Sequence, residues 1–160
     1  MGTKKINIEV ELFCTMWDRA PQTEVLLNET MYFNGPVQAT EQNPLTVNFE
    51  EVINEGEEYS LIIKLTNKDQ SQTVCSKKGN IIKDQLLHIK RIKIHDVDLS
   101  YLLFEGEFFP EYTQPWITDP RNQSKTLPES YKSTVLGHNG SWKYKFSIPL
   151  YKWFLAKGYE

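Results

Sequence analysis

An antiparallel β-sandwich of jelly-roll type with one short C-terminal helix is the fold class that the sequence predicts, and three observations predict it. Ile and Thr occur twelve times each but Ala only three times, which is the reverse of what helices favour and is typical of sheets. Apolar and polar residues alternate in several short segments that are separated by turn residues. The chain has 160 residues, enough for one continuous core and too few for two full-size domains.

The first half of the chain predicts five strands. The apolar residues of the first strand alternate with polar ones and are Ile6, Ile8, Val10 and Leu12. Residues 24–27 and 31–33 flank a short turn and form a second and a third strand. Residues 45–49 and 59–65 form two more, and the turn at 54–57 predicts that they pair as an antiparallel hairpin. We expect the first strand to be buried together with Leu61, Ile63 and Leu65.

The middle of the chain alternates less regularly. Polar residues dominate from 67 to 83, which predicts a long loop of the kind that often carries function. Alternation returns in a strand at 86–94. Residues 101–117 are rich in aromatic residues and proline, with little periodicity, and residues 120–133 form a polar loop.

The last segments predict a closing hairpin and the helix. Residues 135–136 and 142–148 flank the turn 138–141, which is typical of a hairpin. The helix spans residues 150–157, between Pro149 and Gly158, in agreement with the capping preferences of helices.

The chain is therefore expected to divide into a core and an extension. Residues 1–100 predict the sandwich core. Residues 101–160 predict an aromatic-rich extension that completes the same domain or forms an attachment surface.

Charge and hydropathy exclude two classes of partner. The net charge of -3 offers no basic face for nucleic acid. One strand does alternate cations with Ile, and we interpret it as a solvated sheet face; its basic residues are Lys83, His88, Lys90, Arg91 and Lys93. No apolar run approaches the ~18 residues of a membrane span, and the polar start leads into a strand rather than a signal sequence. We expect neither a nucleic-acid nor a membrane partner.

Catalytic and metal-binding patterns are not evident in the sequence. Cys14 and Cys75 lack the paired spacing of a disulfide framework or a zinc site. His88 and His95 fall on opposite faces of one predicted strand, so they cannot share a metal ion without a bulge. Carboxylates that could serve glycoside hydrolysis stand beside the aromatic residues, namely Glu105, Glu107 and Glu111. We interpret them as solvated acids and predict that the chain is not an enzyme.

Two segments resemble a family of sugar-binding domains. Leu65-Thr66-Asn67 ends one predicted strand, and Asp84-Gln85-Leu86-Leu87-His88-Ile89 begins another after the long loop. They resemble the calcium-dependent xylan-binding family of carbohydrate-binding modules, in which Phe-Thr-Asn-Asp ends a strand and Asp-Arg-Asn-Leu-Tyr-Val-Asp follows a loop. The resemblance covers roughly residues 5–98 and implies a small jelly roll.

In that family, the acidic residues of these segments bind calcium together with backbone carbonyls. Asp84 is kept here, but Lys68 and Lys90 stand where the family has acids. Asp69 lies one position beyond Lys68 and can substitute only if the loop shifts. Asp69 and Asp84 are therefore the candidate ligands, and the two lysines predict that no calcium or other cofactor is tightly bound.

The rest of the chain resembles the endings of small proteins of large tailed phages, especially phages of cyanobacteria and other aquatic bacteria. Four segments carry this resemblance in order: residues 102–110 with Trp116, residues 136–142, residues 149–151 and residues 153–155. The resemblance implies a virion protein, assembled in the host cytoplasm and attached to capsid or tail. Its implied partners are other virion proteins, including copies of itself.

Together these observations predict a non-catalytic phage virion accessory protein, a capsid decoration or a tail or fibre protein, that attaches to a larger assembly. The second interpretation is a carbohydrate-binding module that recognises host polysaccharide, and a hydrolase is the third. Aromatic residues are typical of interfaces, although they can equally fill the second half of the core. The candidate interface residues are Phe104, Phe108, Phe109, Tyr112, Trp116, Trp142, Tyr151 and Trp153.

Overall fold

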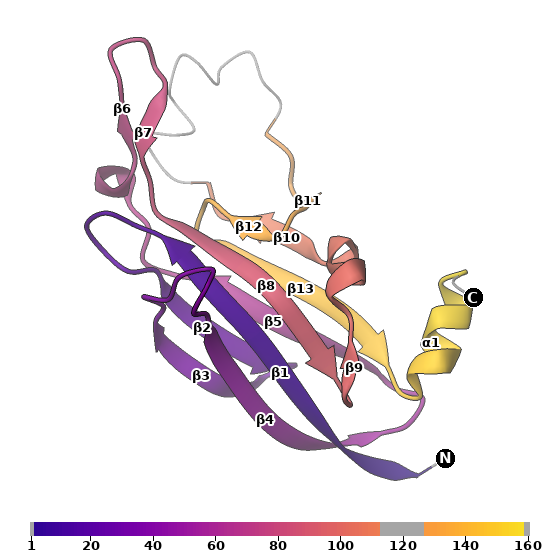
Figure 1. The fold of residues 1–160 in the computed structure, drawn as a ribbon. Helices are drawn as coiled ribbons and strands as arrows, with labels where there is room; N and C mark the ends of the chain where they lie inside the picture. Colours follow the sequence, from indigo (N-terminus) through magenta and orange to yellow (C-terminus); the bar gives the residue numbers. More distant parts are fainter. Residues whose placement is uncertain (1, 113–126, 159–160) are drawn as a thin grey trace.

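The computed structural model describes residues 2–112 and 127–158, and these form a β-sandwich of two antiparallel sheets (Figure 1). The first sheet has the order β12 (Val135–Leu136), β8 (Leu86–Ile94), β1 (Thr3–Thr15) and β4 (Leu45–Asn54), with β9 (Val97–Asp98) paired to one end of β8. The second has the order β11 (Tyr131–Lys132), β10 (Glu107–Pro110), β13 (Gly140–Ser147), β5 (Glu58–Leu65), β2 (Gln22–Leu27) and β3 (Thr30–Pro36). The predicted all-β sandwich with a short C-terminal helix is confirmed.

The inward faces of the two sheets form one core. Every second residue of β1 is buried, and these are the predicted residues Ile6, Ile8, Val10 and Leu12. The facing residues of β5 are also buried, as predicted: Leu61, Ile63 and Leu65. The largest fully buried side chains are Trp142, Tyr144 and Phe146 of β13 and Phe108 of β10. The period of two therefore places the apolar residues correctly on both sheets.

Two predicted hairpins are wrong, because their strands belong to different sheets. β4 pairs with β1, whereas β5 pairs with β2 and β13, so the turn at 54–57 crosses from one sheet to the other. β12 pairs with β8, whereas β13 pairs with β5 and β10, so the turn before β13 also crosses. A short turn is compatible with either arrangement. The crossing gives β13 and β5 a strand on each side and buries their inner faces against the first sheet.

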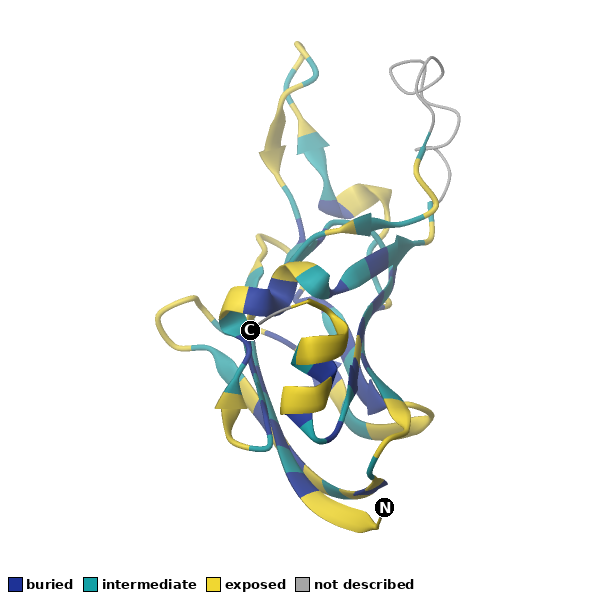
Figure 2. Ribbon diagram, turned by 90° about the vertical axis from the view of Figure 1, so that its right-hand side faces the viewer, coloured by how far each residue is buried: buried dark blue, intermediate teal, exposed yellow. Residues whose placement is uncertain are grey.

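The segment predicted as a long loop contains local structure. It forms the 3-10 turn η1 (Gln70–Gln72) and a small hairpin of β6 (Val74–Cys75) and β7 (Ile81–Lys83) that projects beyond the sandwich (Figures 1 and 2). Residues 120–126 of the predicted polar loop at 120–133 lie outside the described residues, and residues 131–132 form β11. β13 runs between β10 and β5, so residues beyond 100 build part of the same sandwich.

Two short helices lie at one edge of the sandwich. η2 (Ser100–Glu105) follows β9, and α1 (Leu150–Ala156) follows β13 near the predicted position. Lys157 Nζ lies 3.3 Å from Glu105 Oε2 and connects the two. The buried residues of α1 are Leu150 and Trp153, and its other side faces outward (Figure 2). No helix in the described part of the chain is long and apolar enough to cross a bilayer.

Candidate functional site

The predicted interface residues divide into buried and exposed groups. Buried in the core are Phe108, Trp142 and Trp153, which have no exposed ring face to offer a partner. These three serve the core because β10, β13 and α1 turn them inward; the Trp142 indole also donates a 2.8 Å hydrogen bond to the Ser133 carbonyl. Phe109 and Tyr112 are half-buried, whereas Phe104 and Tyr151 are exposed. Trp116 lies outside the described residues.

The candidate metal ligand Asp84 is part of a closed ion pair. Its Oδ1 lies 2.8 Å from Lys68 Nζ, and the two side chains are only 15% and 11% exposed. The same oxygen accepts hydrogen bonds from Thr73 Oγ1 at 2.7 Å and from its neighbouring backbone N–H at 2.9 Å. Lys68 Nζ also donates to the Gly137 carbonyl at 2.6 Å. The ammonium group therefore occupies the space between a carboxylate and a carbonyl, the two groups that a hard cation would take as ligands.

Asp69 has a different cationic partner and does not join Asp84. Its Oδ2 lies 2.9 Å from Arg19 Nη1, and its other oxygen accepts hydrogen bonds from Ser71. These hydrogen bonds, from Ser71 first and then Arg19, lower the pKa of Asp69 to about 2. Within residues 2–112 and 127–158, no group of three or more His, Cys, Asp or Glu side chains converges to hold a metal ion. The described side chains around Asp69 and Asp84 do not fit a calcium ion.

We predict that calcium leaves the stability of the protein unchanged. Calcium binding at Asp84 would have to displace the Lys68 ammonium or place a divalent ion beside it, which costs electrostatic energy. The measurement is a thermal melt with calcium and with chelator, together with calorimetric titration. A chelator-sensitive shift of several degrees that Asp84→Ala abolishes would contradict this prediction.

The histidines and the remaining carboxylates also have separate surroundings. His88 stacks on the Phe13 ring at 4.4 Å and bonds Thr15 Oγ1 at 2.9 Å, whereas His95 lies in the turn beyond the other end of the strand. Burial is the first cause that lowers the pKa of His88, and it also lowers that of His138, where the Lys68 charge adds to it. Of the predicted carboxylates, Glu105 pairs with Lys157, while Glu107 accepts a hydrogen bond from Ser130.

A hollow of about 490 Å³ lies at the edge of β8, next to η2, and we call it the η2 hollow. Among the described strands, β12 pairs only with Leu87 and His88 of β8, and β9 only with Lys93 and Ile94. Between them, loop residues bond this edge: the Ile89 N–H donates to the Thr134 carbonyl at 2.9 Å, and the Ile92 carbonyl accepts from the Leu99 N–H at 2.8 Å. The lining of the hollow combines aromatic rings, hydroxyl groups and ammonium groups: Ile89, Lys90, Ser100, Tyr101, Leu103, Phe104, Lys132, Ser133 and Thr134. Apolar surface with a few polar groups at one place is the usual composition of a ligand site.

The helical geometry of η2 places two aromatic rings on the solvent side of the hollow. In a 3-10 helix, side chains three positions apart lie on the same side. Tyr101 and Phe104 have this spacing and are 71% and 51% exposed. Leu102 and Leu103 occupy the opposite side and are buried in the core. The two leucines thus fix the turn on the sandwich, and the exposed rings form a platform whose position is set by the core.

A β-bulge lies at Lys90, another residue that lines the hollow. The register of β8 against β1 pairs Arg91 with Glu11 and Ile89 with Leu12, which leaves Lys90 without a partner in the ladder. A bulge of this kind re-aims a side chain and is common beside binding sites. Two other cations of the predicted basic face pair with acids, since Arg91 bonds Asp98 at 2.9 Å and Lys93 lies 4.0 Å from Glu9.

Sequence reasoning predicted only Phe104 among the residues that line this hollow. Tyr101 belongs to the predicted aromatic stretch but not to the candidate interface residues, and the sequence places Lys90 on a solvated sheet face. The segment Ser100-Tyr101-Leu102-Leu103-Phe104 carries a signal, since two leucines flanked by aromatics three positions apart match one 3-10 turn. Lys132, Ser133 and Thr134 come from a segment whose sequence gives no comparable indication.

No family model matches this chain, and no curated protein matches it. Two solved structures are similar to this one over most of its length. One is described as vCBM60 in complex with galactobiose; it is 9% identical, with a TM-score of 0.48, covering 86% of this chain and 95% of its own. The other is a form of vCBM60 described in connection with two families of calcium-dependent carbohydrate-binding modules; it is 9% identical, with a TM-score of 0.49, covering 86% of this chain and 88% of its own. Likenesses this remote carry no inference about ligand or metal.

Proposed function

We propose that this chain is a non-catalytic binding module that recognises carbohydrate at the η2 hollow. The observation that carries the proposal is the exposed platform of Tyr101 and Phe104 beside a cluster of hydroxyl and ammonium groups. A sugar ring has an apolar face of C–H groups, which packs on an aromatic face, and a rim of hydroxyls, which need hydrogen-bond partners. The hollow supplies both kinds of contact at one place.

The polar groups of the hollow suit binding better than hydrolysis. Ser100, Ser133 and Thr134 supply hydroxyl groups, while Lys90 and Lys132 supply ammonium groups. Glycoside hydrolysis uses two carboxyl groups that face the scissile bond. The described residues that line the hollow offer hydroxyl and ammonium groups and no carboxyl group.

We predict that Tyr101→Ala weakens saccharide binding about tenfold and changes the melting temperature little. The ring is exposed, so its loss removes a ligand contact and almost no core packing. The measurement is screening on a panel of immobilised neutral and acidic glycans, followed by calorimetric titration of the best ligand.

Tyr151→Ala is the matched control, because Tyr151 is similarly exposed, at 61%, but lies on α1 and outside the hollow. It is expected to bind as the wild type does. Equal binding by the Tyr101→Ala variant and the wild type, or no binding by any glycan of the panel, would contradict the proposed function.

A second candidate function is attachment to a larger assembly, the phage virion that the sequence resemblance implies. Tyr151 and Leu155 favour it, since they lie one helical turn apart on α1 and are 61% and 63% exposed. Exposed apolar side chains that adjoin one another often mark protein contacts. Mass spectrometry of purified particles tests the location. Leu155→Ala would then weaken attachment to particles, whereas Tyr101→Ala would leave it intact.

A further inference from the structure

We propose that the η2 hollow selects acidic saccharides, in which a carboxylate or sulfate group is bound by Lys90 and Lys132 while the sugar ring packs on Tyr101 and Phe104. This inference rests on the proposed function and adds the chemical class of the ligand. It follows from the charge of the hollow, from the positions of the two lysines and from the partners of the nearby acids.

The hollow is positively charged although the chain as a whole carries a net charge of -3. The described residues that line it include two lysines and neither Asp nor Glu. The acids around it have other partners: Asp98 bonds Arg91 at 2.9 Å, Glu105 lies 3.3 Å from Lys157, and Glu107, which is opposite Lys132 in the β10–β11 pair, accepts a 2.6 Å hydrogen bond from Ser130. Within the described residues neither lysine forms an ion pair with an acid, so the charge of both is available to a ligand. Charges within about 8 Å of one another still interact in physiological salt.

The position of Lys90 is fixed without loss of its charge. The bulge in β8 turns its side chain out of the ladder, and its Nζ donates a 2.5 Å hydrogen bond to the backbone carbonyl of Glu41. A carbonyl is a neutral acceptor, so the bond orients the ammonium group but does not neutralise it. An ammonium that is already positioned loses less side-chain entropy when an anion binds.

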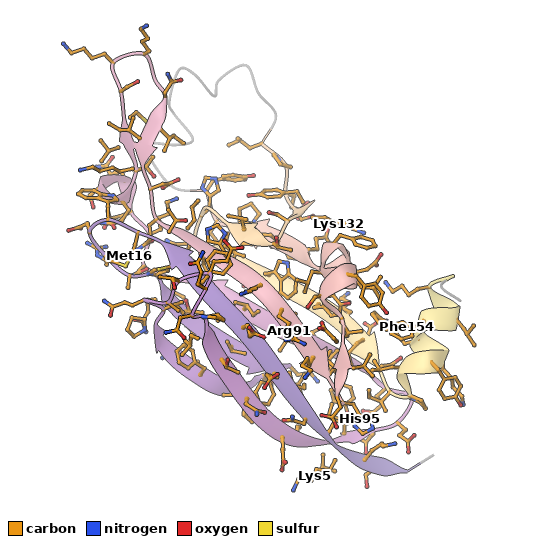
Figure 3. All side chains as sticks on the ribbon, in the orientation of Figure 1. Lys5, Met16, Arg91, His95, Lys132 and Phe154 are labelled. Atoms are coloured by element: carbon orange, nitrogen blue, oxygen red, sulfur yellow. The ribbon has the colours of Figure 1, made fainter. Side chains whose placement is uncertain are left out.

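Lys132 approaches the hollow from the other sheet. It lies on the edge strand β11, next to Ser133 and Thr134, and its position is marked in Figure 3. Its side chain makes no hydrogen bond or ion pair with any other residue of the described part of the chain. Lys90 comes from the first sheet, so an anion bound between the two ammonium groups would bridge both sheets at this edge.

The test compares saccharides that differ only in charge. Calorimetric titration uses a short oligogalacturonate and its methyl ester, and a sulfated galactan oligosaccharide and its desulfated form. We expect the charged member of at least one pair to bind about tenfold more tightly, and the pair that shows the difference identifies carboxylate or sulfate as the anion. The affinity should fall severalfold between about 50 mM and about 300 mM salt, since the lysines are solvent-accessible.

The variants separate the two lysines from general charge effects. Lys90→Gln and Lys132→Gln should each weaken binding of the acidic ligand roughly threefold to fivefold, as expected for partly exposed ion pairs, and Lys132→Arg should restore it. Lys145→Gln, an exposed lysine on β13 that does not line the hollow, should have no effect. A thermal melt of each variant confirms that it is folded.

Three results would overturn the inference. Equal binding of the charged and uncharged members of both pairs would remove the charge selectivity but leave the carbohydrate module standing. If Lys145→Gln weakens binding of the acidic saccharide as much as Lys132→Gln does, the overall charge of the surface attracts the ligand and the hollow does not select it. If neither these probes nor the neutral glycans bind, both the inference and the proposed function fail.

Discussion

Gly106→Ala is expected to lower the free energy of unfolding by about 3 kcal/mol, although it adds only one methyl group. A Cβ at position 106 would lie 2.0 Å from Cζ2 and 2.3 Å from Cε2 of the Trp142 indole, far inside contact distance. The backbone φ of Gly106 is -71°, which any residue can adopt, so the loss is one of space and not of backbone freedom. The indole cannot easily retreat, because it is fully buried and bonded to the Ser133 carbonyl.

Chemical denaturation measures the effect, and Gly137→Ala is the control. A Cβ at Gly137 would lie 3.5 Å from Leu86 Cδ2, an ordinary contact, so we expect a change within about 0.5 kcal/mol. In a Trp142→Phe background the smaller ring leaves room, and Gly106→Ala should then cost clearly less than in the wild type. Wild-type stability of Gly106→Ala would show that the core has space at this point and that the packing is looser than described.

The close packing of Gly106 against Trp142 is a non-local feature, and such features could not be predicted from the sequence. Alternation correctly placed the buried faces of β1 and β5, because the side-chain period of a strand is local. Pairing is not local. The turn at 54–57 fits a hairpin as well as a crossing between sheets, and the crossing follows from the pairing of β4 with β1 and of β5 with β13 and β2.

The η2 hollow depends on non-local features in the same way. The aromatic spacing of Tyr101 and Phe104 can be found in the sequence, since it reflects one 3-10 turn. Lys90 looks like any cation of an alternating strand until the bulge opposite Glu11 and Leu12 is known. Lys132 is brought to the hollow by the pairing of β11 with β10, which no local pattern encodes.

The Lys68–Asp84 pair could not be predicted from the sequence. The sequence draws attention to each residue separately, because Lys68 stands where the resembled family has an acid and Asp84 is a candidate metal ligand. The structure supplies the rest: the Lys68 ammonium lies against Asp84 and also reaches the Gly137 carbonyl, 69 positions along the chain. Asn139 adds hydrogen bonds of 2.8 Å to both the backbone N–H and the carbonyl of Lys68. The loop after β5 and the loop after β12 are thus joined through one residue.

Lys68→Met is therefore expected to lower the free energy of unfolding by about 2 kcal/mol. Removal of one member of a buried ion pair leaves the other without compensation, and this costs about 3 kcal/mol or more when burial is complete. The pair here is 11% and 15% exposed, so water reduces the cost somewhat. Lys5→Met is the matched control, because Lys5 lies at nearly the same distance, 2.9 Å, from Glu50 Oε2 but both side chains are more than half exposed. The melting temperature of the Lys5→Met variant should equal that of the wild type.

The double variant Lys68→Met with Asp84→Asn separates the charge from the packing. An amide at position 84 still accepts the hydrogen bonds of Thr73 and of the neighbouring N–H, and it carries no charge that needs a partner. We expect the double variant to recover at least half of the stability lost in Lys68→Met, because the unpaired carboxylate is the main cost. If the double variant is as unstable as the single one, the cost lies in the lost bond to the Gly137 carbonyl. In that case Lys68 stabilises the protein by holding two loops together, and the ion pair contributes little to the free energy of unfolding.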